Sequence, residues 1–136
     1  MLSSAPFEYP SDLLAQAQRY LPLKTAVVNA ETATIMKSAK LATENNLIEP
    51  TLVGESDAIN SIATAIHWDI RKFTVVDARS EIKAAKLSVG LARSGEVSAL
   101  MKGHIHSETL MQEALQRKQG VRLKRRPSHA FYMTVP

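Results

Sequence analysis

Five short apolar runs, rich in β-branched residues, recur along the chain and are separated by longer segments with a different spacing. They have little polar alternation, as is typical of strands buried on both faces of a parallel sheet. We therefore predict strands at 25–29 (TAVVN), 50–54 (PTLVG), 73–77 (FTVVD), 98–101 (SALM) and 130–135 (AFYMTV).

The segments between these runs have helical spacing. Apolar residues of 57–66 stand at i, i+3, i+4 and i+7, which predicts a helix with one apolar face. Segment 79–94 has a similar stripe, followed by Gly95 as a C-terminal cap; the stripe consists of Ile82, Ala85, Val89 and Ala92. Further helices are predicted at 31–46, at about 11–20 with Ser11 as N-cap, and after 107.

Strands that alternate with helices predict βαβ units with right-handed crossovers. We therefore expect a three-layer α/β/α sandwich with a mostly parallel sheet. The length of 136 residues fits one domain, and no linker divides the chain, so residues 1–136 are predicted to form a single α/β domain.

This architecture predicts where a ligand binds, because open parallel sheets bind ligands beyond the carboxyl ends of their strands. Asn29 and Glu31 follow the first predicted strand, and Gly54 and Asp77 end the next two. A polar pair such as Asn29 and Glu31 could contact a ligand, or it could only cap the helix that follows.

The turn after the fourth predicted strand carries the most distinctive chemistry. It contains Lys102, Gly103, His104, His106 and Ser107. Gly103 permits close backbone approach, Ser107 is a natural N-cap, and an anion there would meet backbone N–H groups, the helix dipole and Lys102. The alternative is a plain strand-to-helix turn, with Lys102 in solvent and Ser107 only capping.

Two other kinds of site are disfavoured at this turn. Histidines at i and i+2 could chelate a metal, but zinc needs three or four ligands and no third one is evident, so no metal is expected. The turn lacks the glycine pair and the Lys-Ser/Thr ending of a P-loop, and the chain contains no G-x-S-x-G nucleophile elbow.

The charge of the chain is unevenly distributed. The net charge is +4, but six basic residues fall within 117–126 and no acid follows Glu113. This pattern indicates an anionic partner such as phosphate, a nucleotide or nucleic acid, although a solvated basic loop would look the same. Arg126 and Ser128, just before the last predicted strand, are candidate phosphate ligands. Nucleic acid is disfavoured, because aromatic residues make up only 5% of the chain.

The composition of the chain restricts its expected cellular location. No apolar run approaches the roughly 18 residues that would span a bilayer, so no membrane association is expected. The first residues do not have the pattern of a signal peptide, and there are no cysteines. A cytoplasmic location is therefore the default expectation.

Several segments resemble, in order and along nearly the whole chain, the phosphate acetyltransferase and phosphate butyryltransferase family. They are AVVNAET (26–32), NNLIEPTLVGE (45–55), FTVVDA (73–78), ALMKGHIHSETLMQEAL (99–115) and GVRLKRRPSHAFYMTVP (120–136). The last two segments are the most specific, and their residues are closer to those of the butyryltransferase-like branch.

The resemblance implies an enzyme that moves an acyl group between coenzyme A and orthophosphate, with coenzyme A as a substrate and no bound cofactor. It implies a two-domain fold like that of the isocitrate and isopropylmalate dehydrogenases, with the active site between the domains. The chain would be the first domain. Asn29, Glu31, Arg126, Ser128 and the turn at 102–107 would then line the acyl-phosphate side.

The chain departs from the family pattern in two ways. The serine–arginine pair associated with catalysis lies in a later part of family members, so no catalytic residue is assigned, and the chain alone is expected to be inactive or nearly so. Met111 also stands where the acetyltransferase branch has an arginine. The alternative function is a non-catalytic module that binds a phosphate or nucleotide ligand or mediates oligomerisation. Half of an enzyme should also expose apolar surface, so we expect self-association or a missing second domain.

Overall fold

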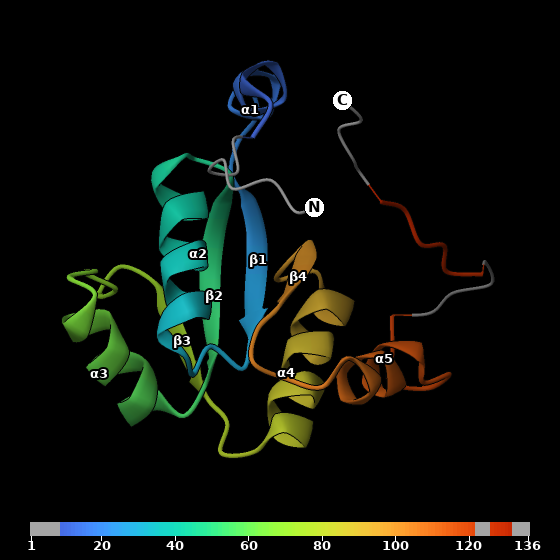
Figure 1. The fold of residues 1–136 in the computed structure, drawn as a ribbon. Coiled ribbons are helices and arrows are strands. Elements are labelled where there is room, and N and C mark those ends of the chain that lie inside the picture. The colour runs from blue at the N-terminus through green and yellow to red at the C-terminus, as the bar shows by residue number, and fades with distance from the viewer. Residues whose placement is uncertain (1–8, 122–125, 132–136) are drawn as a thin grey trace, which may run out of the picture.

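The computed structural model describes residues 9–121 and 126–131 of the chain. Its sheet has four strands, all parallel, in the order β3-β2-β1-β4 (Figure 1). They are β1 (Leu23–Val28), β2 (Ile48–Gly54), β3 (Thr74–Asp77) and β4 (Ala99–Lys102). The first four predicted strands and the α/β fold class are therefore confirmed.

Helices cover both faces of this sheet. The elements are α2 (Ala33–Glu44) and α3 (Ser56–Ala65) on one face, and α4 (Glu81–Ser94) and α5 (Ser107–Leu115) on the other. The short helix α1 (Ser11–Ala17) lies beyond the amino ends of the strands and buries none of its own residues (Figure 1). The described part of the chain thus forms the expected three layers.

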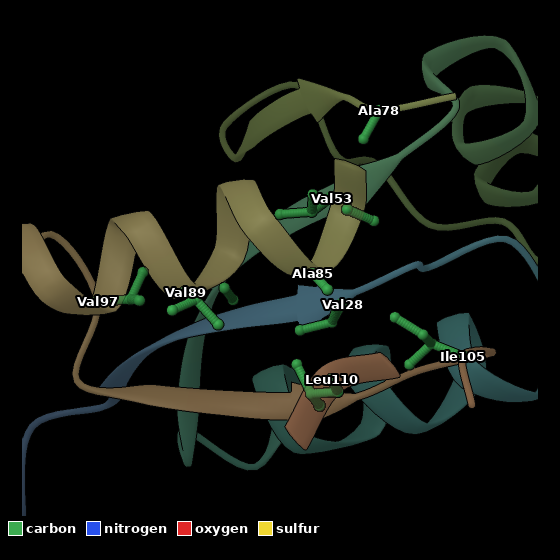
Figure 2. Close-up of a cluster of buried hydrophobic side chains, with 10 residues drawn as sticks. Val28, Val53, Ala78, Ala85, Val89, Val97, Ile105 and Leu110 are labelled. Carbon is green, nitrogen blue, oxygen red and sulfur yellow. The ribbon is translucent and has the colours of Figure 1, made fainter. Parts of the chain in front are cut away.

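The central strand β1 contributes to a hydrophobic core on each side, because successive side chains of a strand point to opposite faces. Val28 packs with Val53 of β2 and with Ala85 and Val89 of α4 (Figure 2). Val27 belongs to the opposite cluster, which includes Met36 of α2. β1 is accordingly buried from Thr25 to Val28.

The described residues contain the five predicted helices, with differences in their faces and caps. The predicted stripe of α4 holds at Ala85 and Val89, which are buried, and at Ala92, which packs against the core. Ile82 is 64% exposed instead, and Ala84 and Ser88 complete the buried face. Small side chains on that face let the helix approach the sheet closely. Ser11 and Ser107 are the first residues of their helices rather than N-caps, since Pro10 and His106 hold the N-cap positions. Gly95 ends α4 in the left-handed conformation, as predicted, with φ of 82°.

The fifth strand predicted at 130–135 is not supported by the two of its residues that the structure describes. Ala130 and Phe131 are in no strand, and Phe131 is 77% exposed, so these residues are not part of the buried sheet. Residues 132–135 lie outside the described residues. A fifth strand would have to pair with one edge of the sheet. Among the described residues the edge strand β4 pairs only with β1.

The strand order fixes the place where a ligand can bind. The chain runs from β1 outward to β2 and β3, and then returns across the sheet to place β4 on the other side of β1. The loops after β1 and β4 therefore lead to helices on opposite faces, which makes the carboxyl ends of these two strands the switch point of the sheet.

Candidate functional site at the carboxyl ends of β1 and β4

Asn29 joins the end of β1 to the turn after β4. Its side-chain Nδ2 donates to the carbonyl of His104 at 2.6 Å, and its own carbonyl accepts from the His104 N–H at 3.1 Å. Asn29 is only 3% exposed and has a φ of +59°, a left-handed conformation that asparagine tolerates better than most residues. The Nδ2 and the backbone carbonyl of Asn29 thus hold the turn, while its buried Oδ1 has no partner among the described residues, and its role as a ligand residue stays a prediction.

Position 103 requires glycine, because the turn after β4 lies directly against the backbone at the end of β1. A Cβ added there would lie 2.2 Å from the carbonyl oxygen of Val28 and 2.7 Å from that of Asn29. The Gly103 N–H donates to the Val28 carbonyl at 2.9 Å. Because backbone atoms cannot move aside as a side chain can, only glycine fits at this position.

The next three residues alternate between solvent and core. Ile105 is 5% exposed and packs into the cluster that contains Val28 and Leu110 (Figure 2). His104 and His106 on either side of it are exposed. Ile105 therefore anchors the turn in the core while both imidazoles face outward.

The N-terminus of α3, at the same edge, is already satisfied by carboxylates. Glu31 Oε1 accepts from the N–H of Glu55 at 2.8 Å, and Asp77 Oδ1 accepts from the N–H of Ser56 at 3.0 Å. The hydrogen bond from the Ser56 N–H lowers the pKa of the Asp77 carboxyl below its ordinary value. Glu31 thus acts as a structural acceptor here, and two negative charges make this helix end unsuitable for an anion.

The N-termini of α2 and α4 are also capped, whereas that of α5 is not. Thr32 and Ser80 accept side-chain capping bonds from the N–H groups of Ile35 and Lys83. His106, the N-cap of α5, makes no side-chain capping bond. The first turn of α5 therefore lacks a side-chain capping bond beside the exposed residues Lys102 and Ser107, although Glu108 and the Glu81 carboxylate also lie at this helix end. Backbone N–H groups at a helix N-terminus can bind an anion.

Glu81 belongs to this site and was not predicted from the sequence. Its carboxylate oxygens lie 2.8 Å and 3.1 Å from Nδ1 of His106, and one of them is 3.4 Å from the His106 N–H. The hydrogen bond from His106 lowers the pKa of the Glu81 carboxyl. The only signal in the sequence is an acid at the start of the helix after the third strand; its pairing with a residue 25 positions later is a tertiary contact.

The structure does not bring every predicted site residue to this edge. Asn29, Glu31 and the turn at 102–107 lie together at the carboxyl ends of the strands. Arg126 and Ser128 are exposed, in a segment that runs apart from the sheet (Figure 1). Their participation stays a prediction.

Nowhere in the described ranges do three or more histidines or carboxylates gather closely enough to hold a metal ion. None of the helices described is long and apolar enough to cross a membrane.

The known proteins that this chain resembles in sequence are phosphate acetyltransferases and phosphate butyryltransferases. The phosphate acetyltransferase of Rickettsia felis is 38% identical over 124 residues, and the phosphate butyryltransferase of Clostridium beijerinckii is 31% identical over 124 residues. Each match covers 91% of this chain, but only 36% and 41% of the respective relative. The family resemblance is confirmed, and of these two relatives the acetyltransferase is the more similar, which does not favour the butyryl branch. No family model matches the chain.

Solved structures agree on the fold. A phosphotransacetylase from Streptococcus pyogenes superposes with a TM-score of 0.67 over 80% of this chain and 43% of its own length, at 15% sequence identity. The chain therefore spans well under half the length of the relatives named here.

Proposed function

We propose that this chain is the first domain of a phosphate acyltransferase, which transfers an acetyl or butyryl group between coenzyme A and orthophosphate in the cytoplasm. The observation that carries the proposal is the turn at 102–107. The turn lies within residues 99–115, one of the two segments in which the family resemblance is most specific. It also lies at the switch point of the sheet, where the N-terminus of α5 has no side-chain capping bond.

The proposed acyl transfer needs chemical groups that this edge of the sheet can provide. The thiolate of coenzyme A attacks the carbonyl of an acyl phosphate, and the protein must hold the phosphoryl group and stabilise negative charge. Lys102 and the first N–H groups of α5 supply positive charge and hydrogen-bond donors, while Asn29 and Gly103 hold the turn rigid.

The site is an open edge, which supports the view that a second domain closes it. Lys102, His104, His106 and Ser107 are all exposed. Catalysis of acyl transfer needs water excluded and both substrates held, so we propose that the chain alone is inactive or nearly so. The same openness favours, as second candidate, a non-catalytic module that binds a phosphate ligand.

Binding and turnover of the purified chain test these proposals separately. We expect calorimetric titration to detect coenzyme A and phosphate binding, and an assay with acetyl phosphate or butyryl phosphate to detect little or no acyl-coenzyme A. Turnover comparable to that of a complete enzyme would overturn the inactive-domain proposal. Binding of phosphate without coenzyme A would favour the non-catalytic module, and binding of neither would reject both candidates.

Lys102 provides a matched pair of variants for the binding experiment. Lys102→Met should weaken phosphate binding about fivefold to tenfold, as expected for the loss of one charge-assisted contact. Lys37→Met changes an exposed lysine of α2 and should leave binding unchanged. Equal effects of the two substitutions would show that phosphate is attracted only by the net charge.

A further inference from the structure

We propose that Arg93 is a latch residue, which fastens the turn that follows α5, residues 116–121, to the end of α4. The first residues of the basic stretch at 117–126 are then an ordered part of the domain, and they leave it only when this latch opens. The inference does not depend on the proposed function. It concerns a charged motif of the sequence that the candidate site leaves unused.

The turn at 116–121 folds back on the C-terminal end of α5. The Gly120 N–H donates to the Gln116 carbonyl at 3.0 Å, and the Val121 N–H donates to the Ala114 carbonyl at 2.9 Å. These bonds occupy carbonyl groups that the end of a helix leaves without partners. Residues 116–121 therefore stay against α5 and do not extend into solvent.

Glycine is needed at position 120 for this turn to close. Gly120 is buried, and a Cβ added there would lie 2.4 Å from the carbonyl oxygen of Ala114 and 2.5 Å from that of Gln116. Backbone atoms cannot swing aside as the end of a side chain can. The turn is thus closely packed at Gly120, although residues 116–119 are exposed.

Arg93 joins this turn to the neighbouring helix. It stands in the last turn of α4, which packs against α5. Its Nη1 donates to the carbonyl of Lys118 and lies 3.4 Å from the carbonyl oxygen of Gly120. Among the described residues, these are the only hydrogen bonds that connect residues 116–121 to an element other than α5. A guanidinium suits this task, because its planar set of N–H donors can serve two acceptors at once.

The latch is held by neutral acceptors alone. The guanidinium of Arg93 forms no ion pair with any carboxylate of the described residues. Arg117 and Lys118 bring further positive charge to the same turn, so charge repulsion opposes its closure. A turn that buries one glycine and depends on a few exposed hydrogen bonds should open locally, without unfolding of the sheet.

Amide hydrogen exchange of the purified chain, followed residue by residue by NMR, tests the latch. Arg93→Met keeps an aliphatic side chain and removes the donors. The amides of Gly120 and Val121 should then exchange about fivefold to tenfold faster, as expected for the loss of hydrogen bonds from a charged donor. The amides of Val27 and Val28 in the core strand β1 should keep their native rates.

Two further variants separate the hydrogen bonds from the charge. Arg93→Lys keeps the charge without the planar set of donors, and its exchange rates should fall between those of the native chain and Arg93→Met. Lys86→Met is the matched control, since Lys86 is an exposed residue of α4 that makes no hydrogen bond to another described residue. It should leave all of these amides unchanged.

Unchanged exchange of Gly120 and Val121 in Arg93→Met would overturn the proposal. A uniform acceleration that includes Val27 and Val28 would also overturn it, because Arg93 would then stabilise the whole domain and not the turn. Native rates in Arg93→Lys, or equal acceleration in Lys86→Met, would show that charge alone governs the turn, and either result would reject the latch.

Discussion

Gly103 and Gly90 differ in what a methyl group would meet, and this contrast shows how the site depends on single residues. A Cβ at Gly103 would contact the backbone of Val28 and Asn29, whereas one at Gly90, in the middle of α4, would have no neighbour within 4 Å. The first glycine allows β1 and the turn after β4 to touch. The second only adds conformational freedom to a helix.

Replacement of these two glycines by alanine should therefore change stability in opposite directions. Gly103→Ala should lower the free energy of unfolding by about 1–3 kcal/mol, because backbone atoms must shift to relieve the clash. Gly90→Ala should raise it by about 0.5–1 kcal/mol, because alanine is the better residue in a helix interior. Urea unfolding of both variants measures this. A Gly103→Ala chain as stable as the native one would contradict the described contact between Gly103 and Val28.

At the scale of elements, carboxylates fasten α3 to the sheet. Glu31 follows β1 and Asp77 ends β3, and both accept hydrogen bonds from backbone N–H groups at the start of α3. Gly54, at the end of β2, makes room for Glu31, since an added Cβ there would lie 3.1 Å from Glu31 Cγ. Three neighbouring strand ends thus share in positioning one helix.

The contact of Asp77 predicts a dependence of stability on pH. Because the pKa of Asp77 is lower in the folded chain, the unfolded chain binds the proton first as the pH falls. Its contribution is fully present above the unfolded pKa of about 4 and is lost as the pH falls through the lower folded pKa. Asp77→Asn should therefore reduce the loss of stability between pH 7 and pH 3.

Asp57 is the matched control, since it lies in the first turn of the same helix, is exposed, and makes no hydrogen bond to another described residue. Asp57→Asn should change the pH dependence less than Asp77→Asn. Urea unfolding at several pH values compares the two, and equal effects would mean that the helix dipole, rather than the hydrogen bond, is responsible.

At the scale of the whole molecule, exposed apolar residues gather at the end of the sheet opposite the site. Tyr20 is 75% exposed and Leu21 is 92% exposed, in the segment between α1 and β1. Nearby, α1 and α2 enclose an apolar groove of about 390 Å³ lined by Leu13, Leu14 and Leu41. Contiguous apolar surface of this kind favours association.

We therefore expect the chain to self-associate through this end and to sediment, at high concentration, as a species heavier than its own 14.9 kDa. Leu21→Ser should shift sedimentation toward the monomer without loss of stability, because the side chain is outside the core. Ile82→Ser, at the carboxyl edge, should leave association unchanged. A monomer at all concentrations, or association sensitive only to Ile82, would contradict this prediction.

The apolar runs and helical spacings were enough to predict the parallel α/β fold and four of its strands, because buried strands need unbroken apolar sequence. They also located the turn at 102–107, since a glycine and polar residues there follow an apolar run and precede a helical spacing. The stripe predicted for α4 was right at Ala85, Val89 and Ala92 and wrong at Ile82, because an apolar residue at the start of a helix can keep the periodicity and still lie outside the contact with the sheet. The roles of Asn29, Glu31 and Glu81 could not be read from the chain. Each depends on a partner 24 to 75 positions away, and only the packing of the strand ends determines which of these polar groups meet.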